Sequence, residues 1–313
     1  MAHDQSSPAS TWRTSDSGIV ARLLHGAIDL HCHSGPSVMP RYLDHYEAMQ
    51  EASAAGIRAL LVKDHYYSAA PVTAILNKHF AHFNVHMLAG VPLNSQSGGL
   101  NVYAVEHGLR LGARLVWMPT FASANHIAHH RQDAHFTEKF PQTKKTMLAP
   151  IPLTILDGAG RLVPELGPIL DLIAEHDAVL SSGHLHVSEI FPLFEEAARR
   201  GVQRRLCNHP TYVVDASHDD IRRLVGMGVY VEHSMCMFVE GSSFKFWDPP
   251  TLQALITAGT VEKTILGSDL GQSGNPRVVD GFRGVIELCL DLGYTEDQVR
   301  RLTGGNAAEL IGL

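Results

Sequence analysis

The sequence predicts a single α/β domain built as a (β/α)8, or TIM, barrel, and three observations lead to this fold. The chain has 313 residues, enough for about two ordinary domains but also a common length for one α/β barrel. Short apolar runs of strand length alternate with longer segments of helical period, as in βα units repeated around a parallel sheet. There are eight such apolar runs, the number that the barrel requires.

The predicted strands are short, and most of them end in polar residues. They cover residues 27–33, 57–63, 84–91, 113–119, 178–184, 204–209, 229–233 and 263–269. Several of the helical segments between them end at a glycine that suits a left-handed C-cap. A doubly wound open sheet is the rival fold, but it would carry a glycine-rich turn after its first strand. Here that turn reads HCHSGPS, which favours the barrel.

Two segments fall outside the repeat. Residues 1–20 are polar and rich in serine, so we expect a polar N-terminal arm before a barrel domain of residues 21–313. The connection at about residues 120–165, between the fourth and fifth strands, is too long for a plain crossover. We expect this insertion to form a lid over the mouth of the barrel or an oligomer contact. We expect its histidines to lie in a solvated, charged loop: His126, His129, His130 and His135.

Composition excludes several classes of function. Lys and Arg number 25 against 32 Asp and Glu, a net charge of −7, and the chain has no basic run that would follow a nucleic acid backbone. We find no apolar run long enough to cross a membrane and no signal peptide. The four cysteines are scattered, which suits a reducing compartment. We therefore expect a cytoplasmic protein without nucleic acid or membrane partners, and a homo-oligomer on general grounds.

Histidine is unusually abundant, with 20 residues, and many of them follow predicted strands. The carboxyl ends of the strands of such a barrel meet on one face, where TIM-barrel enzymes have their active sites. Packing alone does not explain so many polar side chains on one rim. The polar residues at these ends are His31, His33, Lys63, His65, His184, His186, Asn208, His209, Glu232, His233 and Asp269.

The first strand carries two histidines separated by one residue. Because alternate strand residues point the same way, we expect Asp29, His31 and His33 on one face, with Leu30 and Cys32 toward the helices. Two imidazoles can hold one ion, and a third from the fifth strand with a carboxylate from the eighth would complete a ligand set for Zn²⁺. Mn²⁺, Fe²⁺ and Co²⁺ are alternatives. We interpret Cys32 as a buried apolar residue rather than a ligand.

These features resemble the amidohydrolase superfamily of metal-dependent hydrolases, whose members are (β/α)8 barrels. The resemblance covers about residues 27–313 and rests on DLHCH, GSD, His184, His209 and the closing GGNAAELIGL, which is similar to the family's C-terminal helix. It implies one or two divalent metals. By this resemblance His31 and His33 bind the more buried ion, His184 and His209 a second one, and Asp269 both binds metal and transfers the proton of the attacking water.

One part of the family pattern is missing. Many two-metal members bridge their ions with a carboxylated Lys or a Glu from the fourth strand, whereas RLVWMPTF offers neither. Lys63 is the expected substitute, since a buried Lys near a cationic site has a lowered pKa and can form a carbamate. The equal alternative is a Lys that pairs with Asp269 or binds an anionic substrate. His65 is a ligand or an acid.

The reaction that this site predicts is hydrolysis by a metal-activated water. We expect Asp269 to move the proton and His233 or His65 to stabilise the oxyanion. Arg41 and Tyr42 are expected to bind a substrate carboxylate, with packing of the loop after the first strand as the equal alternative. His186 is expected to be a substrate contact, a ligand or an orienting residue.

The expected substrate is a small amide, cyclic imide, lactam or lactone. A substrate of this kind that also carries a carboxylate is one version of this expectation. Alternatives are metal-dependent non-oxidative decarboxylation, phosphoester hydrolysis, and a pseudoenzyme that binds metal or ligand without catalysis. The presence of Asp269 favours catalysis over binding alone.

Overall fold

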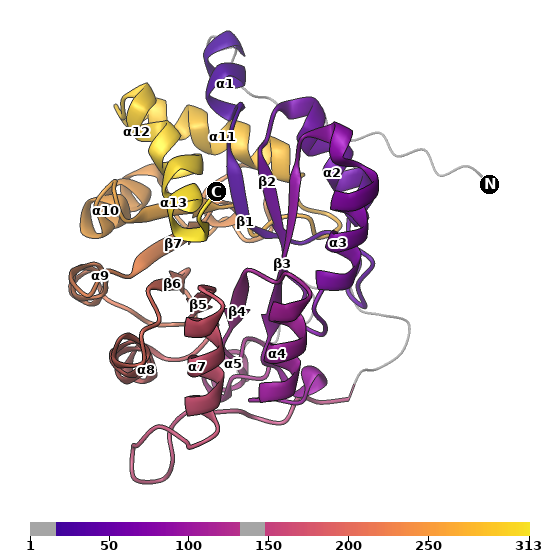
Figure 1. Cartoon of the computed structure of the whole chain (residues 1–313). Helices are drawn as coiled ribbons and strands as arrows, with labels where there is room; N and C mark the ends of the chain where they lie inside the picture. Colours follow the sequence, from indigo (N-terminus) through magenta and orange to yellow (C-terminus); the bar gives the residue numbers. More distant parts are fainter. Residues whose placement is uncertain (1–16, 132–147) are drawn as a thin grey trace.

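The computed structural model of the chain describes residues 17–131 and 148–313 and contains one sheet of eight parallel strands in sequence order (Figure 1). The predicted strands are all present. Their bounds are β1 Ile28–Cys32, β2 Ala59–Val62, β3 His86–Pro92, β4 Leu115–Trp117, β5 Val179–Ser181, β6 Arg204–Asn208, β7 Tyr230–Ser234 and β8 Thr264–Gly267.

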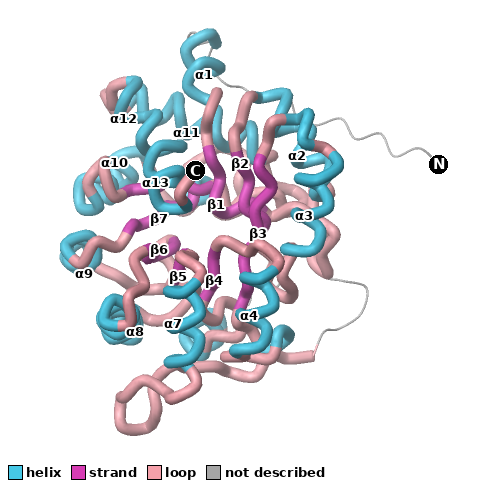
Figure 2. The backbone as a smooth tube through the Cα atoms, viewed as in Figure 1, coloured by secondary structure: helices cyan, strands magenta, loops and turns pink. Residues whose placement is uncertain are grey.

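The sheet closes into a barrel between β1 and the residues that follow β8. The backbone N–H of His33 donates to the carbonyl of Leu270 at 2.8 Å, and that of Asp269 donates to the carbonyl of His31 at 2.9 Å. Strands gather in the centre and helices surround them (Figure 2). The predicted (β/α)8 fold is confirmed.

Helices follow most of the strands and cover the outside of the barrel. Their bounds are α1 Ser17–Leu24, α2 His45–Ala55, α3 Ala70–His79, α4 Val102–Arg110, α5 Ala124–His130, α7 Leu166–Glu175, α8 Val187–Arg199, α9 His218–Gly226, α10 Pro249–Gly259, α11 Val278–Asp291, α12 Glu296–Arg300 and α13 Asn306–Ile311. The local sequence determines where several of these helices begin and end. For example, α2 starts at a capping box between Asp44 and Glu47 and stops at Gly56, whose φ of 78° suits glycine.

Apolar side chains form an inner core inside the strands and an outer core between strands and helices. The inner core contains Ile28, Leu30, Ala59, Leu61, Leu115, Trp117, Val179, Leu206, Tyr230 and Ile265, with Ala307, Leu310 and Ile311 of α13. The predicted C-terminal helix is therefore present, and it packs against the inner core. Arg204, at the start of β6, fixes it by donating to the carbonyls of Glu309 and Leu310. The opposite end of the barrel remains available for polar residues.

A β-bulge in β1 changes the expected direction of one side chain. Pairing with β2 is in register at Asp29 and resumes at Cys32, while the partner strand advances by only two residues. Leu30 and His31 therefore stand opposite Leu61 alone. The expectation that Leu30 faces the helices is wrong, because Leu30 belongs to the inner core. Cys32 packs in the outer core, as predicted.

The two segments outside the repeat are described in part. Residues 17–20 of the expected arm already belong to α1, and the remainder of the arm lies outside the described residues. The insertion contains α5, whose start is joined to the returning chain by hydrogen bonds between Ala122, Ala124 and Leu153. Its lid or oligomer role stays a prediction, partly on residues that are not described. Within the described ranges, no helix has the length and apolarity needed to cross a membrane.

The packing of β3 on β4 generates a stability prediction. A Cβ atom at Gly90 would lie 2.3 Å from the ring of Trp117 and 2.9 Å from the carbonyl oxygen of Leu115. Gly90→Ala should therefore lower the free energy of unfolding by about 1–3 kcal/mol through overpacking. Gly226→Ala, at the end of α9 with no atom within 4 Å of the added carbon, is the control and should be neutral or stabilising. Equal unfolding midpoints in urea would contradict this packing.

Candidate metal centre

Three ligand-type side chains converge where β1 and β8 end. The Nε2 atom of His33 lies 2.9 Å from Oδ1 of Asp269, and the Nε2 atom of His31 lies 3.2 Å from the same oxygen. One donor atom from each of the three residues lies within 4.8 Å of the other two. Both imidazoles are buried. The predicted grouping of His31, His33 and Asp269 is thus present in the structure.

Hydrogen bonds determine which nitrogen of each histidine faces this group. The Nδ1 atom of His31 donates to Oε1 of Glu232 at 2.6 Å, and Nδ1 of His33 donates to the carbonyl oxygen of Lys63 at 2.9 Å. A neutral imidazole has only one N–H. Nε2 of each neutral ring therefore carries the lone pair. That of His33 faces the carboxylate of Asp269, and that of His31 lies beside the same carboxylate and accepts a hydrogen bond from Lys63. A cation bound among these groups would attract both nitrogens and the carboxylate.

Glu232 is the residue that the sequence analysis left without a role. Its second oxygen accepts a hydrogen bond from Asn208 Nδ2 at 3.2 Å, and its side chain is fully buried. Burial raises the pKa of Glu232 to about 7. The signal was available, because Glu232 alternates with the inner-core residue Tyr230 and must point into the barrel. Carboxylates that hold the far nitrogen of a ligand histidine commonly orient it.

A second buried carboxylate fixes the backbone beneath the three ligand-type residues. Asp29 accepts hydrogen bonds from the N–H of His31 at 3.0 Å and from the N–H and hydroxyl of Ser268 at 2.9 and 2.5 Å. Burial raises the pKa of Asp29 to about 7. Asp29 thus joins the bulge of β1 to the residue before Asp269, which itself has a left-handed φ of 50°.

Lys63 reaches the same place from β2. Its Nζ donates to Nε2 of His31 at 2.9 Å and lies 5.9 Å from the centre of the Trp117 ring. Burial lowers the pKa of the Lys63 amine. Lys63 is thus brought to the predicted site, while β4 presents an indole there. Carboxylation of its amine stays a prediction.

The remaining predicted histidines of this face line one pocket of about 490 Å³ together with His33, Lys63 and Asp269. The rings of His184 and His209 have centres 4.9 Å apart, and the ring of His209 lies 5.9 Å from that of His31. His65 stacks on Phe121 at 3.6 Å, and its Nδ1 bonds to the hydroxyl of Thr120 at 2.9 Å. The pocket therefore has a metal-ligand wall and a second wall of imidazoles.

His126 from the insertion also lines this pocket and is only 5% exposed. The expectation of a solvated loop is wrong for this residue, because α5 turns its side chain toward His184. Its neighbour His129 is exposed, as expected, and His135 lies outside the described residues.

Two predicted histidines are not brought to the pocket. His233 follows Glu232 on β7 and points to the opposite side, where its ring bonds to the backbone of Leu255 in α10. His186 instead caps α8, accepting from the N–H of Ser188 at 3.2 Å, and its ring is 3.7 Å from the carboxylate of Asp215. Strand alternation explains the first case, since adjacent residues cannot both face inward without a bulge.

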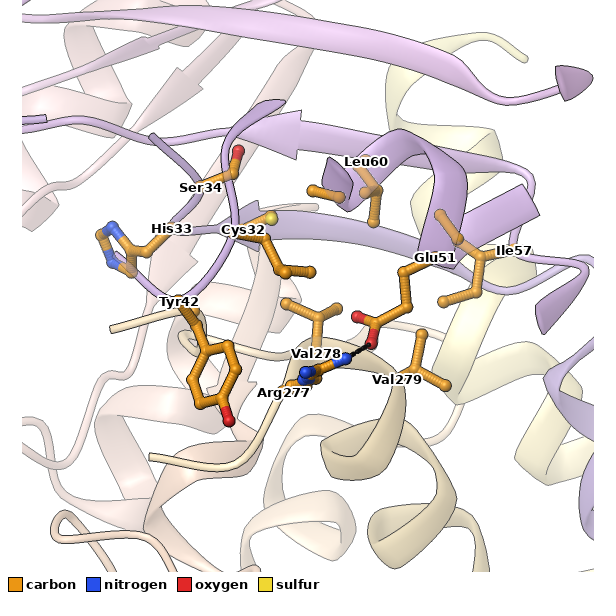
Figure 3. Close-up of a pocket in the computed structure, with 14 residues that line it drawn as sticks. Cys32, His33, Ser34, Tyr42, Glu51, Ile57, Leu60, Arg277, Val278 and Val279 are labelled. Carbon is orange, nitrogen blue, oxygen red and sulfur yellow. Dashed lines mark hydrogen bonds and ion pairs between the residues drawn. The ribbon is translucent and has the colours of Figure 1, made fainter. Parts of the chain in front are cut away.

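Neither Arg41 nor Tyr42 lines the pocket of histidines. The guanidinium of Arg41 is buried 3.7 Å from the carboxylate of Asp64. Tyr42 borders a second pocket of about 350 Å³ near α2 and α11 (Figure 3). Its ring stacks on Arg277, which pairs with Glu51 at 3.0 Å. A role for either residue in substrate binding stays a prediction that this placement does not favour.

The protonation states suit a divalent cation. Burial lowers the pKa of His31 and of His33 to about 3 and that of His209 to about 4, so these rings are neutral near pH 7. Burial alone would raise the pKa of Asp269, but the charge of the nearby Lys63 helps to hold it well below its usual value. Neutral imidazole nitrogens and an ionised carboxylate form the donor set that Zn²⁺ and its first-row neighbours bind. The side chains of His31, His33 and Asp269 are therefore suitable ligands for a divalent metal ion.

Residues 26–232 match the model of a family described as a family of unknown function (DUF6282). The chain belongs to this family. No curated protein matches the sequence.

Solved structures with the same fold include an amidohydrolase from Pseudomonas aeruginosa, with 14% identity, a TM-score of 0.60, and coverage of 94% of this chain and 97% of that one. A 2,6-dihydroxybenzoate decarboxylase from Rhizobium has 11% identity, a TM-score of 0.54 and coverage of 92% and 99%. A zinc-bound amidohydrolase from Burkholderia multivorans has 12% identity, a TM-score of 0.51 and coverage of 85% and 86%. The predicted resemblance to the amidohydrolase superfamily is confirmed at the level of the fold.

The buried histidines predict that the metal-free protein is sensitive to acid. Burial lowers the pKa of eight of them: His31, His33, His45, His65, His126, His184, His209 and His233. Below about pH 6.5 these histidines bind protons in the unfolded chain but stay neutral in the folded chain. Their full contribution to the free energy of unfolding is therefore present above that pH and is lost as the pH falls below it. Each histidine contributes up to about 1.4 kcal/mol per pH unit.

Urea unfolding in the presence of a chelator at pH 7.5 and 5.5 measures this loss. The raised pKa values of Asp29 and Glu232 act in the opposite sense but come from two groups only. We expect a lower free energy of unfolding at pH 5.5. An unchanged or higher value would show that these histidines are not buried as neutral rings.

Proposed function

We propose that the protein is a metal-dependent hydrolase that acts on a small molecule through a metal-activated water. One observation carries the proposal: Nε2 of His33 and Nε2 of His31 lie 2.9 and 3.2 Å from the same carboxylate oxygen of Asp269, beside the pocket that His33, Lys63 and Asp269 line. Two buried imidazoles and a partly exposed carboxylate thus converge on one place, where a cation would bind all three. The solved amidohydrolases that share the fold support this proposal.

His31, His33 and Asp269 are the residues that would hold the metal, with Lys63 beside them. Zn²⁺ suits two imidazoles and a carboxylate, and Mn²⁺, Fe²⁺ or Co²⁺ are alternatives. A bound divalent metal lowers the pKa of water to about 7 and polarises the bond that is attacked. The sequence hypothesis of a second ion at His184 and His209 is compatible with their position on the opposite wall.

Asp269 is the proposed proton carrier. Its carboxylate lines the pocket and is ionised at neutral pH, because the charge of the nearby Lys63 helps to hold its pKa low. It is therefore ready to accept the proton of an attacking water and to return it to the leaving group. The hydrogen bonds of Asp29 to the neighbouring Ser268 keep Asp269 in place.

His65 is the better candidate for stabilising the developing oxyanion. It lines the pocket, whereas His233 faces α10. Thr120 occupies its Nδ1, and stacking on Phe121 fixes the plane of the ring. Nε2 is then the nitrogen left for a substrate, and a fixed donor of this kind stabilises charge at little cost in reorganisation.

The pocket indicates a small substrate with a flat, partly apolar body. Phe121, Tyr212, Met237 and Phe244 line it together with the histidines, so apolar contacts surround a few polar groups. We propose an amide, cyclic imide, lactam or lactone as the group that is cleaved. A carboxylate on such a substrate would meet Lys63 and the imidazoles rather than Arg41.

The test is turnover by zinc-loaded protein on a panel of amides, imides and lactones. Asp269→Asn should reduce kcat by about 10²–10⁴-fold, the usual contribution of a general acid–base residue, while the protein stays folded by circular dichroism. Asp291→Asn, at the exposed end of α11, is the matched control and should keep full activity.

Product analysis in H₂¹⁸O separates hydrolysis from its competitors. Incorporation of ¹⁸O into the acid product is expected. Release of carbon dioxide without ¹⁸O in the product would replace the proposal with non-oxidative decarboxylation, and inorganic phosphate from a phosphoester would replace it with phosphoester hydrolysis. Undiminished turnover in the Asp269→Asn protein would overturn the role of Asp269.

A further inference from the structure

We propose that His126, supplied by the insertion rather than by the barrel, is a ligand to a second divalent cation together with His184 and His209. This inference rests on the proposed metal-dependent function and concerns the opposite wall of the same pocket. It makes the insertion a part of the metal site.

The start of α5 is fastened directly to the end of β5. The hydroxyl of Ser123 and the side-chain amide of Asn125 both donate to the carbonyl oxygen of His184, at 3.0 and 3.1 Å. Asn125 also donates to the carbonyl oxygen of Val213 at 2.7 Å, on the segment that follows β6. These three bonds fix the helix between the two strands that carry His184 and His209. His126 is the next residue after Asn125 and therefore has a defined position over the pocket.

Two of the three imidazoles are in direct contact, and the third lies beside them. The Nδ1 atoms of His126 and His184 are 2.9 Å apart, with ring centres at 4.7 Å. The ring of His209 lies 4.9 Å from that of His184. Two nitrogens that each lie about 2.1 Å from one ion are separated by about 3 Å or slightly more. The contact between His126 and His184 is thus near the spacing of two ligands on a common metal.

The three rings are buried, and His209 shows two features that suit a ligand. All three are 4–5% exposed. The Nδ1 atom of His209 is buried and has no hydrogen-bond partner among the described residues. The backbone of His209 is also held at a left-handed φ of 27°, a conformation that costs energy in a residue other than glycine. A cation would use the lone pairs that this arrangement brings together.

The alternative is that His126 only orients His184 through a hydrogen bond. The two roles differ in what a substitution does. A glutamine side chain can still donate to the ring of His184, so His126→Gln would leave metal binding nearly intact if the role were orientation. If His126 is a ligand, the second ion loses one of its imidazoles. The experiment therefore counts ions and does not depend on knowing a substrate.

Chelator-treated protein is titrated with Co²⁺ alone, using equilibrium dialysis and visible absorption. Wild type should bind about two equivalents. His126→Gln should keep the first equivalent at wild-type affinity and bind the second at least tenfold more weakly. His129→Gln, on the same helix but exposed, is the matched control and should behave as wild type. Circular dichroism confirms that each variant is folded.

His126→Cys gives a second, independent readout. A thiolate is itself a ligand for Co²⁺, so this variant should restore the second equivalent. It should also add a thiolate-to-cobalt charge-transfer band in the near ultraviolet. A residue that only orients His184 would produce no such band.

The outcomes separate this inference from the proposed function. Two equivalents bound by His126→Gln with wild-type affinity, and no charge-transfer band in His126→Cys, would overturn the role of His126. A single equivalent in wild type that disappears in His31→Ala would also overturn it, while leaving the first metal centre and the proposed function standing. Failure of wild type to bind Co²⁺ at all would overturn both.

Discussion

The hydrogen bonds that Asp29 accepts across the closing seam of the barrel are the interaction on which the metal centre depends. They join the bulge of β1 to Ser268, beside Asp269, and Asp29, His31 and Ser268 are all buried. Without the bulge, Leu30 and His31 would face opposite sides of the strand. With it, Leu30 completes the inner core and Nε2 of His31 lies 3.2 Å from Asp269. The packing that stabilises the barrel and the geometry that would hold a metal are therefore built by the same backbone irregularity.

A division between the two ends of the barrel follows from this. Apolar side chains and α13 fill the amino ends of the strands, and Trp117 forms the boundary with the polar end, 6.5 Å from the ring of His31. Above that boundary, buried imidazoles and carboxylates satisfy one another only in part. Polar groups buried in this way are costly unless they are paired, and a cation would pair them. The proposed function is thus also an explanation of why so much histidine is buried.

The sequence predicts the barrel well because strand length, alternation and strand-end polarity are local properties. It also predicts His31, His33, Lys63, His184, His209 and Asp269 on one rim, since parallel strands bring their carboxyl ends together. It does not predict the bulge, because a one-residue change in pairing depends on the partner strand, and Leu30 was misplaced for that reason. Glu232 and His233 are a different case, because strand alternation with Tyr230 already indicates that Glu232 faces inward and His233 outward. His126 depends on how an insertion folds back, which no local pattern contains.

The most direct measurement of the central claim is anomalous X-ray diffraction at the zinc edge from crystals grown with zinc. The account predicts an anomalous peak about 2.0–2.2 Å from Nε2 of His31, Nε2 of His33 and the carboxylate of Asp269. Glu232 should remain on Nδ1 of His31 in the same map. A map with no zinc among these three residues, or with zinc only at surface histidines, would contradict the account.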